Sequence, residues 1–184
     1  MYGLVNKALQ EVVIKRGGID TWEQVAARAG VRTGDFISNE SYPDELTYTL
    51  VGAASSELDI EANQLLHEFG VHWVLETAQH GYGSLLAAGG SSLHEFLCNL
   101  PSLHARIALI FPHLRPPEFV LVDESAEHVT LEYHSDREGL AAFVVGILDG
   151  LGQMFGTPTT VTQIGLRADA GHDTFVTRWA GAST

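Results

Sequence analysis

The feature that most constrains the fold is a change in the spacing of apolar residues near the middle of the chain. In the first part, apolar residues recur with a period of about 3.6, which indicates amphipathic helices. After the prolines from Pro112 to Pro117, apolar and polar residues alternate, which indicates strands with one buried face. The chain has 184 residues, of which 45% are hydrophobic and 18% charged, a composition typical of one packed domain. We therefore expect an α+β fold, helical first and mixed afterwards.

Four helices are expected in the first half of the helical part. The first ends at Gly17, where a glycine pair stops the apolar stripe. Asp20 and Glu23 have the spacing of a capping box and predict the start of a short second helix. A third helix follows, and Asp59 is expected to cap a longer fourth one that runs toward Gly81.

Two more helices are expected before the prolines. Ser92 and Glu95 repeat the capping-box spacing and predict a helix start. Asn99 can cap a further helix, because Pro101 is tolerated in a first turn where its missing N–H costs little. This last helix contains His104.

The second part predicts a four-stranded antiparallel sheet with one long helix. A hairpin is indicated by alternating apolar residues, which are Phe119, Leu121, Val129, Leu131 and Tyr133. A helix from Leu140 to Phe155 follows. Two further strands are expected to meet across a turn at residues 169–172, through Val161, Ile164, Leu166, Phe175 and Trp179.

Charge and cysteine content exclude several classes of function. The formal net charge of −13 disfavours nucleic acids and anionic membranes, which are bound through Lys and Arg clusters. The lone Cys98 excludes an internal disulfide and a four-cysteine metal cage from this chain alone. Residues 1–16 lack a signal-peptide pattern, and no apolar run approaches ~18 residues. We expect a cytoplasmic protein that binds neither nucleic acid nor membrane.

His104 lies within an apolar stripe of its predicted helix. The residues three, four and seven places away are Leu100, Ile107, Ala108 and Phe111. A buried imidazole must satisfy at least one ring nitrogen, either through a metal ion or through a backbone carbonyl. The pattern by itself favours the structural role, because most core histidines are satisfied within the protein.

Tyr133, Ser135 and Arg137 alternate in an extended segment, so their side chains are expected on one side over about 13 Å, at ~3.3 Å per residue. Two hydroxyl groups and a guanidinium fork suit one or two anionic groups, such as the two carboxylates of a porphyrin. The alternative is a solvated strand end at which Arg137 pairs with a nearby acid, namely Glu132, Asp136 or Glu138.

Two other pairs have metal-ligand spacing on predicted helices. His94 and Cys98 are four residues apart, as are His72 and Glu76, but the sequence indicates no third ligand for either pair. We interpret them as solvent-facing side chains. Glycines at 146, 150 and 152 lie inside the last predicted helix and indicate the close approach of a neighbouring element or of a flat ligand, with packing the favoured cause.

Together these segments resemble the haem nitric-oxide/oxygen-binding (H-NOX) family, which includes the sensor domain of the soluble guanylate cyclase beta subunit. The resemblance covers essentially the whole chain. It rests on MYGLVN at 1–6, LVGAAS at 50–55, LH at 103–104 and YxSxRxGL at 133–140. The cyanobacterial type is indicated by GYG at 81–83, FP at 111–112 and LRPP at 114–117.

The resemblance implies a single haem-binding domain over 1–184, with a helical N-terminal lobe of about residues 1–60, a haem-ligating α/β lobe of 61–184 and the haem buried between them. It implies haem b with His104 as the proximal iron ligand, and propionates held by Tyr133, Ser135 and Arg137. Pro117 is expected to press on the porphyrin. The distal pocket is expected to be lined by Val5, Trp73 and Phe143.

Two departures from the family pattern qualify these expectations. Oxygen-binding members carry a tyrosine five residues after the motif arginine, and Ala142 stands there in this chain. Bound oxygen needs a hydrogen-bond donor, so this departure favours nitric oxide, although the Trp73 indole could supply a donor in part. Pro101 replaces an Asp that is common before the proximal histidine.

The function expected from the resemblance is a gas sensor without a catalytic motif. It would bind nitric oxide and carbon monoxide at ferrous haem, with weak or no stable oxygen binding. It would signal to a separate effector, a histidine kinase or a cyclic-di-GMP enzyme. The alternative is an apolar-ligand or zinc-binding module without haem.

Overall fold

The computed structural model describes residues 1–32, 36–110 and 115–180. Eight α-helices, a π-helical segment and four strands follow one another in the described chain. They are α1 (Gly3–Gly17), α2 (Ile19–Arg28), α3 (Asp44–Leu58), α4 (Ala62–His72), the π-helical segment η1 (Trp73–Ala78), α5 (Gln79–Ala87), α6 (Leu93–Ile110), β1 (Glu118–Ser125), β2 (His128–His134), α7 (Ala141–Met154), β3 (Thr159–Gly165), α8 (Arg167–Ala170) and β4 (Asp173–Trp179). The expected α+β fold is confirmed.

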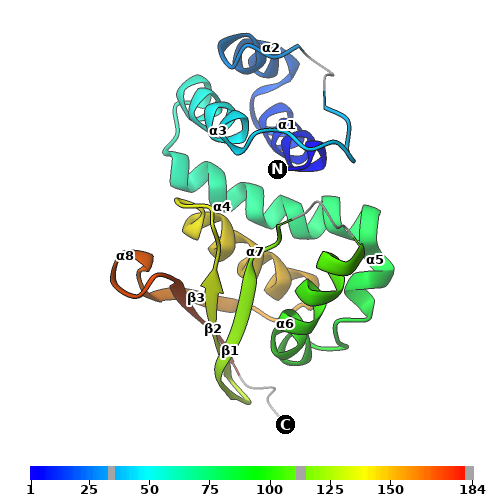
Figure 1. The fold of residues 1–184 in the computed structure, drawn as a ribbon, viewed down its shortest axis with the longest axis vertical. Coiled ribbons are helices and arrows are strands. Elements are labelled where there is room, and N and C mark those ends of the chain that lie inside the picture. The colour runs from blue at the N-terminus through cyan, green and yellow to red at the C-terminus, as the bar shows by residue number, and fades with distance from the viewer. Residues whose placement is uncertain (33–35, 111–114, 181–184) are drawn as a thin grey trace.

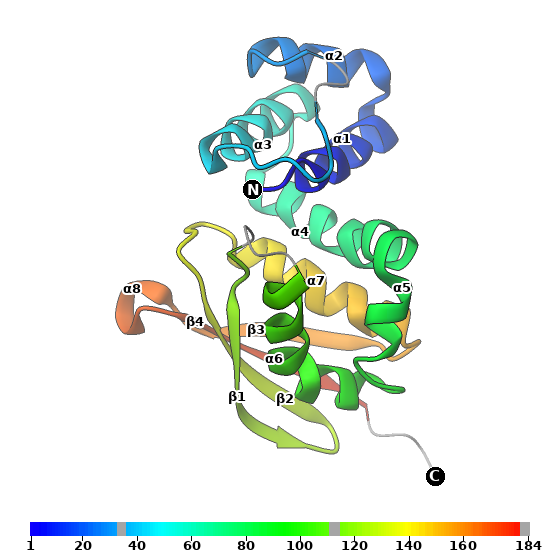
Figure 2. The ribbon, with the colours of Figure 1, turned by 45° about the vertical axis from the view of Figure 1, so that its right-hand side comes forward.

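The elements form layers stacked along the longest axis of the molecule. Helices α1, α2 and α3 lie at one end, α4 crosses beneath them, and the remaining helices and the sheet lie on the other side of α4 (Figures 1 and 2). One apolar core joins α1, α2, α3 and the first part of α4, and a second lies between the sheet and helices α6 and α7. The segment η1 contributes to both cores, because Trp73 packs on the first and Val74 belongs to the second.

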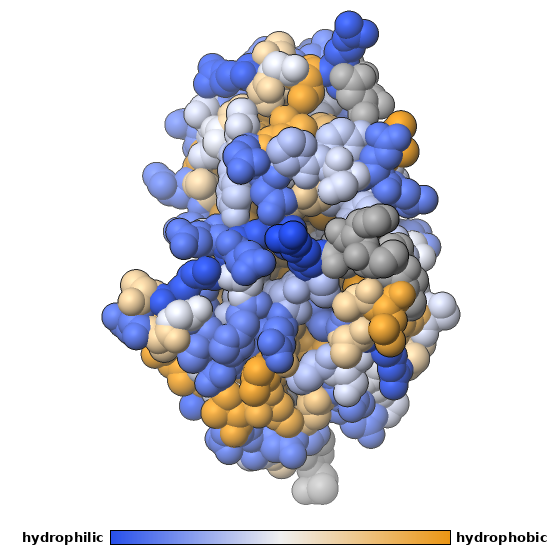
Figure 3. Space-filling view, viewed as in Figure 1, coloured by the Kyte–Doolittle hydropathy of each residue, from blue (hydrophilic) through white to orange (hydrophobic). Residues whose placement is uncertain are grey.

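The sheet has the strand order β1-β2-β4-β3, and all neighbouring strands are antiparallel, as expected. Helix α6 packs on β1 and β2, and α7 packs on β3 and β4. Both helices share one apolar core with the sheet, so they cover the same face. The other face carries exposed apolar side chains, and Figure 3 shows such side chains gathered low on the molecule, where the strands lie.

The last hairpin differs from the expectation in its phase. Val161 is half-buried and packs on the second core, but Ile164 and Leu166 are exposed. Burial alternates without interruption from Thr159 to Leu166, so Ile164 and Leu166 lie on the face opposite Val161. The prediction that Ile164 and Leu166 face β4 was therefore wrong.

Helices α4 and α7 cross at unusually short range because glycines lie at the crossing. A Cβ at Gly146 would lie 2.1 Å from the carbonyl oxygen of His67, and a Cβ at Gly70 would lie 2.2 Å from that of Phe143. Gly150 and Gly152 similarly lie close to Val71 and Thr159. The favoured interpretation of the three α7 glycines, close packing of a neighbouring element, is confirmed.

Several predicted helix ends were wrong, although the helices exist. Helix α2 begins at Ile19 with Gly18 as its N-cap residue, so Asp20 lies inside the first turn instead of capping it. Asp59 adopts a left-handed conformation (φ 52°) that ends α3, and α4 begins only at Ala62. A short Asp side chain can occupy either kind of helix end, which is why the local sequence did not decide between them.

The region expected to hold two helices forms the single helix α6. Ser92 begins it as predicted, because its hydroxyl accepts the backbone N–H of Glu95 at 3.2 Å. Pro101 lies in the helix interior, and Asn99 donates to the carbonyl of Gly89 at 3.0 Å instead of capping a new helix. Burial of Leu97, Leu100 and Leu103 on either side of the proline holds both halves in the same core, which offsets the cost of the lost hydrogen bond. The predicted end at Pro112 lies outside the described residues.

Candidate functional site

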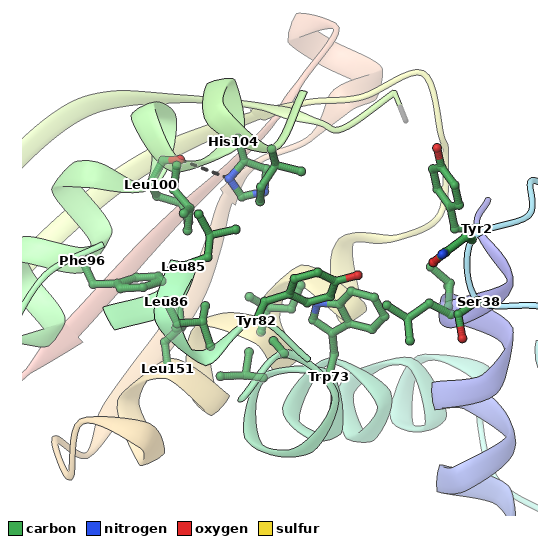
Figure 4. Close-up of a pocket in the computed structure, with 18 residues that line it drawn as sticks. Tyr2, Ser38, Trp73, Tyr82, Leu85, Leu86, Phe96, Leu100, His104 and Leu151 are labelled. Carbon is green, nitrogen blue, oxygen red and sulfur yellow. Dashed lines mark hydrogen bonds between the residues drawn. The ribbon is translucent and has the colours of Figure 1, made fainter. Parts of the chain in front are cut away.

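An elongated cavity of about 220 Å³ lies between α6 on one side and η1 with α5 on the other. Figure 4 shows His104 on one wall, Trp73 and Tyr82 on the opposite wall, and Tyr2 and Ser38 at one end. Most of the lining is apolar, and it consists of Tyr2, Leu4, Val5, Ser38, Asn39, Trp73, Val74, Ala78, Tyr82, Leu85, Leu86, Phe96, Leu100, Leu103, His104, Ile107, Ile147 and Leu151. A site of this kind suits a largely apolar ligand with a few polar anchor points.

His104 is held in one tautomer and one orientation. Its Nδ1 lies 3.1 Å from the carbonyl oxygen of Leu100, one turn earlier in α6. A carbonyl only accepts hydrogen bonds, so Nδ1 carries the proton and the lone pair is left on Nε2. The ring also packs against Phe119, with centroids 4.8 Å apart. This arrangement, with a backbone carbonyl behind the ring, is the one that metal-binding histidines commonly use.

The surroundings keep His104 neutral. Burial lowers the pKa of His104, and the hydrogen bond to Leu100 offsets only part of this effect. A neutral imidazole is the form that binds a metal ion, so no proton has to be displaced from Nε2 at neutral pH. The neutral imidazole therefore fits an iron ligand, and the apolar lining in front of the ring suits the apolar body of a porphyrin.

The π-helical segment η1 forms much of the wall opposite His104. It contributes Trp73, Val74 and Ala78 to the lining. Tyr82 follows in α5 with non-helical dihedral angles (φ −141°, ψ 27°), which kink the helix at the cavity. Single π turns that interrupt α-helices frequently occur at functional sites. Sequence reasoning missed Tyr82 as a lining residue, and its only signal was the pair of glycines on either side of it.

Tyr133, Ser135 and Arg137 form a second group, which Phe119 connects to His104. The Phe119 ring lies 5.4 Å from the ring of Tyr133 and 4.8 Å from that of His104. Burial raises the pKa of Tyr133, although the Ser135 side chain, with which it is hydrogen-bonded, acts in the opposite direction. The phenol therefore remains a protonated hydrogen-bond donor. The hydroxyl of Ser135 accepts the backbone N–H of Arg137 at 3.1 Å.

Arg137 reaches across to the N-terminal helices. Its Nε donates to the carboxylate of Asp44 at 2.8 Å, and its Nη1 donates to the carbonyl of Arg115 at 2.8 Å. Asp44 also binds the amino group of Met1. Burial raises the pKa of Asp44, but the Met1 amino group and Arg137 outweigh it, so the pKa lies below its usual value. The alternative in which Arg137 pairs with an acid close to it in sequence is wrong, because the acid it pairs with lies on α3.

The structure brings together some of the predicted site residues and not others. Val5, Trp73 and His104 line the cavity. Of the rest, Phe143 packs on Phe69, with ring centroids 4.7 Å apart, and belongs to the first core. Pro117 is half-buried directly before β1. Neither of these two is among the lining residues that the structure describes, and the same holds for the motif residues of β2 and the loop after it.

Two weaker candidates from the sequence have different outcomes. The Nε2 of His72 lies 2.8 Å from a carboxylate oxygen of Glu11 on α1, so His72 pairs across to another helix instead of with Glu76. His94 and Cys98 lie within reach of each other and of a third group, Glu124. No helix in the described part of the chain is long and apolar enough to cross a membrane.

Comparison with known proteins gives one family. The family model described as Haem-NO-binding matches residues 2–163. The chain is 31% identical over 151 residues to the soluble guanylate cyclase gcy-32 of Caenorhabditis elegans. This alignment covers 80% of this chain and 22% of the relative. The chain thus spans about a fifth of the length of this relative.

Solved structures share the whole fold. An Fe(II) unliganded H-NOX protein from K. algicida superimposes with a TM-score of 0.88 at 19% identity, covering 100% of this chain and 99% of that one. An H-NOX protein from S. oneidensis in the Fe(II)NO ligation state gives a TM-score of 0.86 at 15% identity, covering 98% and 100%. At these identities the likeness establishes the fold.

Proposed function

The chain belongs to the haem-NO-binding family of haem-based gas sensors related to soluble guanylate cyclases, and from this premise we propose that it holds haem b on His104 and senses nitric oxide. The observation that carries the proposal is the state of His104. Its Nδ1 proton is bound by the Leu100 carbonyl, and its Nε2 lone pair is left for a metal on the cavity side. A histidine with a purely structural role would need only the first of these features.

We assign the haem propionates to Tyr133, Ser135 and Arg137. Two hydroxyl groups and a guanidinium are a donor set that matches carboxylates. The bond from Arg137 to Asp44 supports a further role, because it connects this donor set to the N-terminal helices. A change in how the propionates are held would thereby change the contact between the two ends of the molecule. The single domain over 1–184, its lobes of about 1–60 and 61–184, and the contact of Pro117 with the porphyrin are part of the same proposal.

The bound haem iron supplies a coordination position for a diatomic gas. We propose that nitric oxide and carbon monoxide bind there and that oxygen binds weakly or not stably, because Ala142 cannot donate a hydrogen bond. Val5, Trp73 and Phe143 are the proposed residues of the distal pocket. One observation favours stable oxygen binding as a second candidate: Trp73 and Tyr82 both lie on the wall opposite His104 and both carry a donor group.

The signal is proposed to leave through α6. This helix carries His104 and packs on β1 and β2, so a displacement of the imidazole shifts the helix against the sheet. A ligand changes such an equilibrium only if it binds one arrangement better than the other. The proposed receiver is a separate effector, a histidine kinase or a cyclic-di-GMP enzyme, and the proposed location is the cytoplasm.

The test is the visible spectrum of the ferrous, haem-loaded chain before and after nitric oxide, carbon monoxide and oxygen, for the wild type and His104→Gly. We expect the gas-free spectrum to depend on His104 and to be restored in the variant by added imidazole. Arg106→Gly is the matched control, since it is exposed on the same helix and carries the same glycine cost of about 1 kcal/mol without removing a ligand.

Three outcomes would contradict parts of the proposal. Failure of the wild type to retain haem would exclude the sensor and favour the apolar-ligand or zinc-binding module. A spectrum that is the same in His104→Gly would remove His104 as the ligand. A stable oxygen complex would replace nitric-oxide selectivity with the second candidate.

A further inference from the structure

Three side chains of metal-binding type meet where the first half of α6 packs on β1. His94 and Cys98 lie four residues apart on α6, and Glu124 comes from β1. The Cys98 Sγ lies 3.8 Å from His94 Nε2 and 2.7 Å from Glu124 Oε2, and the His94 and Glu124 atoms lie 3.3 Å apart. The sequence predicted that the two α6 residues could share a metal but indicated no third ligand. The structure supplies it.

A β-bulge explains why Glu124 points toward α6. Leu121 pairs with Leu131, but the register then shifts so that Glu124 pairs with Val129. Leu131 and Val129 are both buried on the face that α6 covers, and residues paired across antiparallel strands share a face. Without the extra residue, Glu124 would face away from α6, because side chains alternate along a strand. Bulges commonly re-aim a side chain in this way.

An inward-pointing charge can also protect an edge strand against pairing with another chain, and β1 is an edge strand. Edge protection explains one acid, but it does not explain a thiol and an imidazole aimed at the same point. Tetrahedral zinc with its usual bond lengths needs ligand atoms about 3.3–3.6 Å apart. Two of the three distances already lie within about 0.3 Å of that range. The third distance joins the thiol to the carboxylate that accepts its hydrogen bond, and it must lengthen by about 0.6 Å when zinc binds.

We propose that His94, Cys98 and Glu124 bind Zn²⁺, with a fourth position open to solvent. Thiolate, imidazole and carboxylate are all ligands that zinc accepts in proteins. The side chains of His94 and Glu124 are 40% and 50% exposed, so a hydrated cation can reach them. On binding, the Cys98 thiol releases its proton to solvent, and the Sγ–H hydrogen bond is replaced by an Sγ–Zn bond. The ion would link β1 to the helix that carries His104, independently of haem.

Cys98 makes the test specific, because it is the only cysteine in the chain. The haem-loaded chain without an affinity tag is treated with a thiol-alkylating reagent at a series of buffered free Zn²⁺ concentrations, and the single adduct is followed by mass spectrometry. We expect Zn²⁺ to slow alkylation at least tenfold and Mg²⁺ to leave it unchanged. Equilibrium dialysis followed by elemental analysis measures the bound zinc in parallel.

The variants separate this site from other zinc-binding groups. His94→Asn and Glu124→Gln are expected to raise the zinc concentration needed for half-protection about tenfold or more. His172→Asn is the matched control: it removes a histidine from a second cluster, with Glu132 and His134, and should leave protection of Cys98 intact. Unchanged haem absorbance verifies folding in each variant. Absence of protection in the wild type, or protection unaffected by His94→Asn and Glu124→Gln, would overturn the proposal and leave edge protection as the role of Glu124.

Discussion

Alanine at position 146 is expected to destabilise the protein, although alanine is normally the better helix former. Gly146 lies on α7 at its crossing with α4, where a Cβ would lie 2.1 Å from the carbonyl oxygen of His67. A carbon and a carbonyl oxygen come no closer than about 3.3 Å even in favourable contacts. Helix α4 would therefore have to retreat by about 1.2 Å, and a backbone atom cannot rotate out of the way as a side chain can.

The magnitude follows from two opposing effects. Overpacking a close contact costs about 1–3 kcal/mol, and a backbone clash at a helix crossing belongs in the upper half of that range. The gain in helix propensity from glycine to alanine returns about 1 kcal/mol. The net loss in the free energy of unfolding is about 1–2 kcal/mol. For a domain of this size, that corresponds to a decrease in Tm of about 2–8 °C.

The assay is thermal unfolding followed by circular dichroism at 222 nm, with wild type and variants loaded equally with haem because a bound ligand itself raises Tm. Gly52→Ala is the control, since Gly52 is exposed in α3 and no described atom lies within 4 Å of a Cβ there. The free energy of unfolding of Gly52→Ala should be about 1 kcal/mol larger than that of the wild type, and its Tm about 2–4 °C higher. If Gly146→Ala melted at or above the wild-type temperature, the inferred close contact between α4 and α7 would be refuted.

Three other predictions concern the cavity, the lobe contact and the thiol. If oxygen binds stably, Tyr82→Phe and Trp73→Phe should each speed the dissociation of oxygen at least tenfold in stopped-flow measurements. Unchanged rates in both variants would exclude the Tyr82 hydroxyl and the Trp73 indole as hydrogen-bond donors to oxygen. Because the pKa of Asp44 is lowered in the folded protein, its contribution to stability is present above the unfolded pKa and is lost as pH falls through the folded pKa. In denaturant unfolding, the wild type should be more stable than Asp44→Asn at pH 7, and this difference should shrink below about pH 4. An equal difference at all pH values would contradict the prediction. Burial and Glu124 raise the pKa of Cys98 to about 12, so alkylation of the thiol in metal-free buffer at pH 8 should be slow. Alkylation should become at least threefold faster in Glu124→Gln. An equal or slower rate in this variant would show that the carboxylate does not hold the thiol protonated.

The order of the elements and the sheet could be predicted because amphipathic periods are local properties of the sequence. The spacing of apolar residues located both hairpins and every long helix except α6, which it divided into two helices. A feature that depends on a displacement by one residue could not be predicted in this way. The bulge that re-aims Glu124 leaves no mark on the composition of β1, and it decides which face the side chains after it occupy.

The continuous helix through Pro101 was also beyond local reasoning. The sequence shows a proline that normally starts or breaks a helix, whereas the structure shows that buried leucines on both sides keep the two halves in line. Packing outweighed propensity at this point.

The candidate site was predictable in its chemistry but only partly in its geometry. The apolar stripe around His104 indicated a buried imidazole, and two ways of satisfying it were left open. The structure shows that a backbone carbonyl satisfies one nitrogen and leaves the other available, so the alternatives were not exclusive. The partner of Arg137 was not predictable, because Asp44 lies 93 residues away in sequence.

The π-helical turn also makes the cavity adjustable by chain length. An α-helix advances by about 100° per residue, so removing one residue from η1 would restore an uninterrupted helix and rotate everything beyond it by that angle relative to α4. The glycine crossing anchors α4 on α7, so the rotation would fall on α5 and would carry Tyr82 off the wall. A single-residue insertion or deletion could therefore retune ligand discrimination in a descendant of this protein while every pocket side chain stayed the same.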